Sequence, residues 1–262
     1  LKEMAQHLRN EKEICIVYHI RPDGDCIGSA YALATALQSI GVRTAVTGRD
    51  PVPKAFRRLT DAFVPDQLEN PVWLSLDTSS PNRTGIYENQ HFTYCIDHHN
   101  DNSIEADDRY VEPDCGACSE IIYKLLVEME IPITKQIADL LYTALVTDTL
   151  CFRTSATSAQ SFRTAAALAE CGADIAEIGK RHMMYKTRGR MQIEDALREA
   201  GMDYVSSMGD AALELGENGG YTYVAIDLTD NIPYDNEEAR QKIVSAALRT
   251  RELLKAVEFT EI

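Results

Sequence analysis

The sequence predicts an α/β protein with a largely parallel sheet in its N-terminal domain and a smaller α+β C-terminal domain. Short apolar runs rich in β-forming residues alternate with helical patterns in the first hundred residues, as in βαβ units. Residues of metal-ligating types follow three of these runs, and ligands bind at the carboxyl ends of strands in open parallel sheets. The end of the chain instead reads strand, helix, strand.

The spacing of apolar residues predicts each element in order. Strands are expected at residues 14–18, 42–47, 72–76, 92–96, 221–228 and 255–260. Helices are expected at residues 2–9, 27–40, 118–129, 133–147, 158–171, 174–200 and 236–249. Pro22 and Gly24 favour a turn after the first strand, so the helix that follows is expected to begin only near Ile27. Ser80 and Pro81 are typical of a helix cap and first turn after the third strand.

Length and composition are those of an ordinary globular protein. The chain has 262 residues, of which 45% are apolar and 26% charged, enough for one large or two modest domains. It shows no run long and apolar enough to cross a membrane and no leader pattern. The seven cysteines lie scattered through expected strands and helices, which favours reduced thiols and a cytoplasmic location.

The formal net charge of −15 argues against some partners. A protein that grips long nucleic acid by its backbone needs a basic face, so long nucleic acid is not expected as a partner. Because no membrane-spanning run is present, no membrane is expected as a partner either. A small anionic substrate, such as a nucleotide or a short oligonucleotide, could still be held by a few basic residues and bound metal. A homodimer is left open.

The stretch from Ile14 to Ser29 carries the first candidate site. An apolar run ends at His19, and Asp23 and Asp25 follow in the expected turn. Aspartates are common turn formers, so in isolation this reading is the more ordinary one. The interpretation as turn formers becomes less convincing because other expected strands also end in aspartate or histidine.

The later candidates follow the same pattern. The third strand run ends at Asp77, and the fourth delivers Asp97, His98 and His99 in succession. Asp148 follows a strongly apolar helical stripe. Asp77 could be a helix cap, and the histidines and Asp148 could be surface residues. Independent capping, however, does not predict that three strand ends stop in ligand-type residues.

Divalent cations explain why these residue types occur together. Several carboxylates in one cleft repel each other, and without compensation at least one takes up a proton near neutral pH. Oxygen ligands mixed with imidazole suit Mn²⁺ or Mg²⁺ better than a thiolate-bound Zn²⁺. A pair of such ions about 3.5–4 Å apart can stabilise the entering and leaving oxygens of a displacement at phosphorus. The sequence therefore predicts a two-metal phosphoesterase.

The ordered motifs resemble those of the DHH phosphoesterases. They are His19-x-x-x-Asp23-x-Asp25-x-x-Gly28-Ser29, then Asp77, then Asp97-His98-His99, and finally Thr147-Asp148-Thr149. The downstream Phe152-Arg153 and Thr157 also resemble the branch of nanoRNases and 3′-phosphoadenosine 5′-phosphate phosphatases. Enzymes of that branch remove nucleotides from very short oligoribonucleotides and dephosphorylate 3′-phosphoadenosine 5′-phosphate.

The resemblance implies a role for each motif residue. One metal ion would be held by His19, Asp23 and Asp77. The other would be held by Asp25, Asp77, His98 and Asp148, so that Asp77 bridges the pair. His99 would bind the phosphoryl oxygens or assist the leaving group, Asp97 would orient an imidazole, and both join Asp77 as expected catalytic residues. The ions are expected to be Mn²⁺, with Mg²⁺ or Co²⁺ as alternatives, and they would activate the attacking water.

Substrate contacts are expected from four further residues. The backbone amides of Gly28 and Ser29, at the expected helix start, could add to a phosphate cradle. Arg83 and Arg153 are candidates for positive side chains near the substrate.

The resemblance also divides the chain into parts. A catalytic domain is expected over residues 1–190, a helical connector over 191–200, and a substrate-binding domain over 201–262, with the substrate in the cleft between the domains. Members of the family usually end in a glycine-rich stretch that contains a histidine, and this sequence has none, so the last domain is expected to be incomplete. Two alternatives therefore stay open: a cyclic or linear dinucleotide phosphodiesterase, and a nucleotide-binding regulator with weak catalysis.

Overall fold

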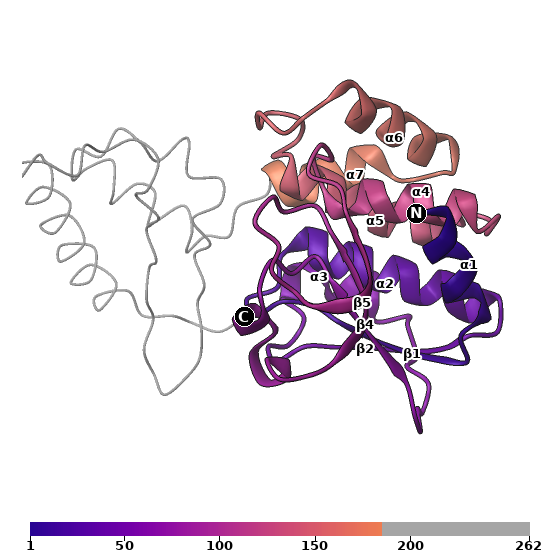
Figure 1. The fold of residues 1–262 in the computed structure, drawn as a ribbon. Coiled ribbons are helices and arrows are strands. Elements are labelled where there is room, and N and C mark those ends of the chain that lie inside the picture. Colours follow the sequence, from indigo (N-terminus) through magenta and orange to yellow (C-terminus); the bar gives the residue numbers. More distant parts are fainter. Residues whose placement is uncertain (185–262) are drawn as a thin grey trace, which may run out of the picture. The chain divides into compact units, whose positions relative to one another are not determined.

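The computed structural model describes residues 1–184 and contains a parallel sheet of five strands in the order β2-β1-β3-β4-β5 (Figure 1). All neighbouring strands pair in parallel, as the sequence predicts. The strands are β1 (Glu13–Val17), β2 (Arg43–Thr47), β3 (Val72–Leu76), β4 (Phe92–Asp97) and β5 (Ala106–Val111). The fold class expected for this part of the chain is thus confirmed.

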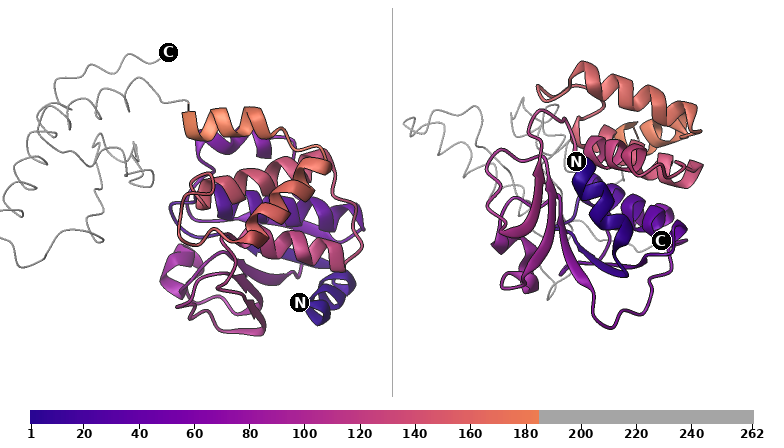
Figure 2. Two further views of the ribbon diagram at one scale, coloured as in Figure 1. Left: turned by 90° about the horizontal axis from the view of Figure 1, so that it is seen from above. Right: turned by 45° about the vertical axis from the view of Figure 1, so that its right-hand side comes forward.

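Helices connect and cover the strands. They are α1 (Lys2–Asn10), α2 (Gly24–Ser39), α3 (Lys54–Thr60), α4 (Cys118–Glu128), α5 (Lys135–Asp148), α6 (Ala159–Glu170) and α7 (Ile175–Gly179), with a 3-10 segment η1 (Pro81–Tyr87) and a π-helical turn η2 (Lys180–Met184). The helices lie on one face of the sheet (Figures 1 and 2): α2 and α4 pack against the strands, α5 packs on α2 and α4, and α6 packs on α5.

The core forms where apolar faces of the helices meet the sheet. Every residue of β1 is buried, which agrees with its position inside a parallel sheet. The helix α2 is apolar nearly all round, because it is enclosed between the sheet and α5. On the opposite face of the sheet, Val17, Phe92, Cys95 and Ile104 form a smaller cluster that Trp73 and Tyr87 cover. Tyr87 belongs to η1, so this segment shields that face.

The expected start of the second helix is wrong. The helix begins at Gly24, because Asp23 caps it: the Asp23 Oδ1 atom accepts hydrogen bonds from the backbone amides of Asp25 and Cys26, each at 3.0 Å. Asp25 therefore lies in the first helical turn rather than in a loop.

Two elements are absent from the sequence-based expectation. β5 lies at the edge of the sheet, where a strand pairs with only one neighbour and is only partly buried. Its sequence, ADDRYV, can therefore be polar and shows no clear apolar run that would predict a strand. The short helix α3 follows Pro53, and with only seven residues it has no long apolar pattern that would predict it.

Other expectations have mixed outcomes. The helix expected at 174–200 is described to residue 184 only, where α7 passes into the π-helical turn η2. The remainder of that helix, the connector 191–200 and the elements expected in 201–262 lie outside the described residues. All seven cysteines are free thiols, as expected. Within the described residues no helix is both long and apolar enough to span a membrane.

Candidate metal centre

The predicted ligand residues meet at the carboxyl edge of the sheet, where the strand order reverses. β1 and β3 are neighbours, but the chain passes from β1 to β2 on one side and from β3 to β4 on the other. Such a switch point leaves a crevice outside the strand ends, the usual ligand position in open α/β sheets. His19 follows β1 and Asp77 follows β3, so both border this crevice.

His19 and Asp23 form one side of the site. The His19 Nδ1 atom lies 2.7 Å from the carbonyl oxygen of Ile20, and its Nε2 atom lies 3.4 Å from Asp23 Oδ2. Donation from Nδ1 leaves Nε2 unprotonated in the neutral ring. Because Asp23 uses Oδ1 to cap α2, its Oδ2 atom is available to a cation beside the His19 Nε2 atom.

Asp25 links the start of α2 to the start of α4. Its Oδ1 atom accepts hydrogen bonds from Ser119 N at 3.1 Å and from the Ser29 hydroxyl at 3.0 Å, and its Oδ2 atom accepts one from Cys118 N. The first backbone amides of α4 have no partners inside the helix, and Asp25 satisfies two of them. Asp25 is only 1% exposed, and burying a charge is costly unless it is hydrogen-bonded. These three bonds offset that cost and fix the position of the carboxylate.

Asp77 is the most constrained residue of the site. Its backbone has a positive φ of 51°, which is uncommon for a residue with a side chain and carries strain. The side chain is buried, and its Oδ1 atom has no hydrogen-bond partner among the described residues. Burial, followed by the charges of Asp25 and Asp23, raises the pKa of Asp77 well above its usual range. An orphaned oxygen of this kind is well placed for a cation, which would remove the penalty.

His98 points its Nε2 atom at three carboxylates. This atom lies 3.8 Å from Asp25 Oδ2, 3.5 Å from Asp77 Oδ1 and 3.7 Å from Asp148 Oδ2. The Nδ1 atom donates to the carbonyl oxygen of Cys115 at 3.1 Å. Burial opposes protonation of His98, but Asp25 and Asp148 outweigh it and raise its pKa.

Asp97 orients the neighbouring imidazole of His99. The Asp97 Oδ1 atom lies 2.7 Å from His99 Nδ1, and its Oδ2 atom accepts a hydrogen bond from Asn102. The His99 Nδ1 atom is also 3.9 Å from Asp77 Oδ1, so the ring lies beside the centre. Asn102 was not recognised from the sequence, because nothing local signals a contact that depends on the loop after β4.

A close contact between α2 and α5 brings Asp148 to the other ligands. Asp148 is the last residue of α5, and α5 packs along α2. A Cβ atom on Gly24 would lie 2.2 Å from the Thr147 hydroxyl, and one on Gly28 would lie 2.5 Å from the Leu140 carbonyl oxygen. Glycines four residues apart share one helix face, so these two let the helices approach closely.

The donor set fits divalent cations. Ligand atoms within 4.8 Å of one another fall into three groups, and Asp77 belongs to two of them. With metal–ligand bonds of about 2.0–2.2 Å, two atoms on the same ion lie about 3–4 Å apart, as the His98 distances do. The groups are His19, Asp23, Cys26 and Asp77; Asp77, His98 and His99; and Asp25, His98 and Asp148.

Cys26 is a member of these groups that the sequence did not suggest. Its thiol is fully buried, and burial followed by the charge of Asp23 raises its pKa well above the usual range. A thiol that stays protonated is a poor ligand, since the thiolate is the form that binds metal. The oxygen and imidazole donors therefore define the site.

The structure places the expected substrate contacts unevenly. Because α2 begins at Gly24, Gly28 and Ser29 lie in its second turn, where backbone amides donate within the helix. Their expected position at a helix start is wrong, and Gly28 faces α5 while Ser29 bonds Asp25. The carbonyl oxygen of Arg83 accepts a hydrogen bond from Ile20 N at 2.7 Å, next to His19. Arg153 is exposed and follows Asp148 in the next turn.

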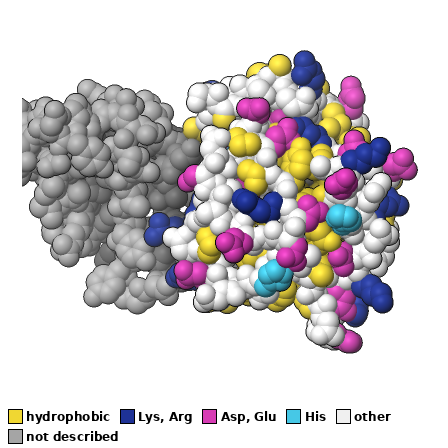
Figure 3. Space-filling view, in the orientation of Figure 1, with side chains coloured by type: hydrophobic (Ala, Val, Ile, Leu, Met, Phe, Trp, Pro, Cys, Tyr) yellow, Lys and Arg dark blue, Asp and Glu magenta, His cyan; other side chains and the backbone are white. Residues whose placement is uncertain are grey.

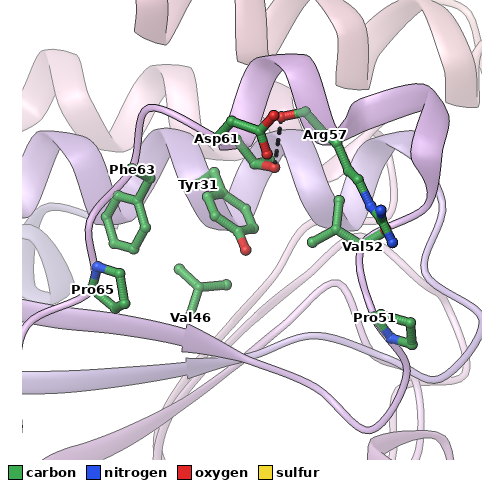
Figure 4. Close-up of a pocket in the computed structure, with 9 residues that line it drawn as sticks. Tyr31, Val46, Pro51, Val52, Arg57, Asp61, Phe63 and Pro65 are labelled. Carbon is green, nitrogen blue, oxygen red and sulfur yellow. Dashed lines mark hydrogen bonds between the residues drawn. The ribbon is translucent and has the colours of Figure 1, made fainter.

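A pocket of about 360 Å³ lies elsewhere, between α2, β2 and α3. Tyr31 and Phe63 meet edge to face in it, 5.3 Å apart, with Val46 and Val52 nearby (Figure 4). None of the candidate ligands lines this pocket.

On the described part of the face in Figure 3, Lys and Arg side chains lie singly among Asp and Glu, without a continuous basic band.

Comparisons with known proteins point to one family. The family described as "DHH family, N-terminal domain" matches residues 13–145. The chain is 32% identical over 181 residues to a Thermus thermophilus protein named "bifunctional oligoribonuclease and PAP phosphatase NrnA", covering 65% of this chain and 54% of that protein. It is 29% identical over 181 residues to the "probable manganese-dependent inorganic pyrophosphatase" of Enterococcus faecalis, covering 63% of this chain and 56% of that protein.

Solved structures agree on the fold. A crystal structure of an exopolyphosphatase-related protein from Bacteroides fragilis covers 75% of this chain and 64% of its own, with a TM-score of 0.68 and 20% identity. At that identity the likeness shows the fold alone. The chain spans about half the length of the curated relatives just named.

Proposed function

Because the chain belongs to the DHH family, we propose that it is a two-metal phosphoesterase that hydrolyses short oligoribonucleotides, 3′-phosphoadenosine 5′-phosphate, or both. One observation carries the proposal: the His98 Nε2 atom lies within 3.8 Å of carboxylate oxygens of Asp25, Asp77 and Asp148. These residues come from four different segments of the chain. Without a cation this cluster would hold mutually repelling acids around one ring.

The two sides of the crevice would each hold one ion. His19 and Asp23 would hold the first, and Asp25, His98 and Asp148 would hold the second, with Asp77 between them. Mn²⁺ is the first choice, and Mg²⁺ or Co²⁺ are alternatives, since oxygen and imidazole ligands suit such ions. The ions would activate water and offset the charge of the phosphoryl group.

The remaining residues act on the substrate. His99 is held by Asp97 through Nδ1, so its Nε2 atom is free to contact a phosphoryl oxygen or the leaving group. Arg83 and Arg153 supply positive charge at the rim of the site.

The substrate class comes from the relatives. The Thermus thermophilus protein is named as an oligoribonuclease and PAP phosphatase, and a Streptococcus mutans relative, 28% identical over 183 residues, is named "probable bifunctional oligoribonuclease and PAP phosphatase NrnA". These names and the resemblance of Phe152-Arg153 support that branch. The net charge of −15 favours a small substrate over long nucleic acid.

Two other functions are kept as alternatives. A cyclic or linear dinucleotide phosphodiesterase would use the same metal centre with a different substrate-binding part. A nucleotide-binding regulator would bind a nucleotide tightly with slow turnover, but the complete set of candidate ligands argues against it. The Enterococcus faecalis relative adds pyrophosphate as a substrate to test.

A substrate panel tests the proposal. The full chain would be incubated with Mn²⁺ and a diribonucleotide, 3′-phosphoadenosine 5′-phosphate, a cyclic dinucleotide or pyrophosphate, and phosphate or mononucleotide release would be measured. We expect the first two to be hydrolysed fastest and EDTA to stop the reaction. Preference for the cyclic dinucleotide or pyrophosphate would overturn the substrate assignment, and tight binding without turnover would favour the regulator.

A further inference from the structure

Glu120 is a buried carboxylate to which the proposed hydrolysis gives no role. It lies in the first turn of α4 and is fully buried. Its Oε1 atom accepts hydrogen bonds from the Gly116 backbone N–H at 3.0 Å and from the Ser161 hydroxyl at 2.7 Å. Its Oε2 atom has no hydrogen-bond partner among the described residues. Burial of a carboxylate with one oxygen unpaired lowers the stability of the fold, so a compensating role of Glu120 is expected.

The bond from Gly116 leads back to the metal centre. The N–H of Gly116 and the carbonyl of Cys115 belong to the same planar peptide group. On the other side of that group, the Cys115 carbonyl accepts the hydrogen bond from His98 Nδ1 at 3.1 Å. His98, one peptide group and Glu120 therefore form a single series of hydrogen bonds that ends in a carboxylate.

We propose that Glu120 is a positioning residue for His98, which acts through the Cys115–Gly116 peptide and raises the affinity of the metal centre. Hydrogen bonds in series polarise one another, so a carboxylate on the N–H side makes the carbonyl a stronger acceptor. A stronger acceptor keeps the proton on Nδ1 and makes Nε2 a better ligand. The inference rests on the metal centre of the proposed function.

The packing around Gly116 fits this role. A Cβ atom at this position would lie 3.0 Å from the Ala156 carbonyl oxygen, 3.1 Å from the Ser161 hydroxyl and 3.2 Å from Glu120 Oε1. Contacts this close leave little room for a side chain. The glycine thus allows the peptide to lie directly against the carboxylate.

A purely structural role would be different. Through Ser161, Glu120 also ties α4 to the first turn of α6. If that tie were its only purpose, removing either partner would change the free energy of unfolding and leave the metal centre unaffected. Metal affinity therefore separates the two roles.

Two matched variants carry the first test. Glu120→Gln keeps an oxygen acceptor but removes the charge, and Ser161→Ala removes the tie to α6 but keeps the carboxylate. Isothermal titration of the full chain with Mn²⁺ should show a Kd about tenfold higher for Glu120→Gln, the low end of the loss seen for outer partners of metal ligands. Ser161→Ala should lower the unfolding midpoint and leave the Kd close to wild type. Unchanged affinity in Glu120→Gln, or an equal loss in both variants, would overturn the proposal.

A second measurement separates this inference from the proposed function. Nitrogen-15 spectra of the metal-free protein should show His98 protonated at Nδ1, and in Glu120→Gln the Nδ1–H signal should move upfield and exchange faster. If the wild type binds Mn²⁺ but hydrolyses no phosphoester, the proposed function fails and the Kd comparison still decides on Glu120. If it binds no Mn²⁺, the spectra decide, and an unchanged Nδ1–H signal in Glu120→Gln refutes the role.

Discussion

The Nδ1 atom of His99 lies 2.7 Å from the Oδ1 atom of Asp97, and the side chain of Asp97 is completely buried. Burial opposes ionisation of this carboxyl, but hydrogen bonds from His99 and Asn102 outweigh it and lower the pKa of Asp97. Asp97 is therefore a carboxylate at neutral pH, and a carboxylate can only accept from the ring. This fixes the tautomer of His99 with its proton on Nδ1.

Asp97→Asn should lower kcat by about 10- to 100-fold and leave the Kd for Mn²⁺ close to wild type. The Asp97 carboxylate uses one oxygen for His99 and the other for Asn102. An asparagine side chain has only one oxygen, so it cannot accept from both, and His99 loses its fixed orientation. Steady-state kinetics on the best substrate of the panel, together with titration of Mn²⁺, measures both quantities. In a double-mutant cycle, adding Asp97→Asn to His99→Ala should cost no further activity. A full additional loss would mean that Asp97 acts through something other than His99.

The contact between α2 and α5 is tested by adding one methyl group. Gly28→Ala would place a Cβ atom 2.5 Å from the Leu140 carbonyl oxygen and 2.8 Å from the Ala144 Cβ atom, so the helices must move apart. Overpacking of this kind costs about 1–3 kcal/mol, and urea unfolding measures it.

Gly179→Ala is the matched control for that variant. Gly179 lies in α7, and a Cβ atom there would have nothing within 4 Å. The same substitution should leave the free energy of unfolding unchanged or raise it by about 0.5–1 kcal/mol. Equal effects of the two substitutions would show that the close packing at Gly28 does not limit stability.

Asp77 predicts the response of the protein to metal removal and pH. In the metal-free protein its pKa lies above the ordinary aspartate value of 3.8, so the folded state binds the proton more tightly than the unfolded state. The free energy of unfolding therefore falls as pH rises from 3.8 through the raised pKa, and the loss persists at neutral pH.

Asp77→Asn removes this charge. After treatment with EDTA at neutral pH, its unfolding midpoint should exceed that of the wild type by about 2–4 °C, which corresponds to ~1 kcal/mol. Mn²⁺ should raise the midpoint of the wild type and have little effect on the variant, because a bridging ligand is missing. A wild-type response of Asp77→Asn to Mn²⁺ would exclude the bridging role.

The sequence was sufficient to predict β3 with its observed bounds and to expect His19, Asp77 and His98 at one edge of the sheet. Both follow from local patterns, since a short apolar run marks a strand and the ends of neighbouring parallel strands meet. These signals need no knowledge of distant segments.

The features that could not be predicted depend on contacts across the chain. The caps that Asp25 provides to α4 join residues 93 and 94 positions apart, and no local pattern reveals such a pairing. The sequence suggests a phosphate contact for Gly28 because backbone amides at a helix start can bind phosphate, whereas its observed role depends on the packing of α5 against α2. The polar edge strand β5 was missed for the same reason, since only its pairing with β4 defines it.

The last prediction concerns charge at the rim of the site. Arg153→Gln should raise KM about tenfold while the Kd for Mn²⁺ stays close to wild type, because one charge-assisted bond to a phosphate is lost. Lys135→Gln removes the same charge at the first residue of α5, at the other end of the helix from Asp148, so its KM should not change. The KM of Arg153→Gln should also depend less on ionic strength than that of the wild type, since screening acts on the removed charge. Equal changes of KM in both variants would show that net charge alone, and not a contact from Arg153, attracts the substrate.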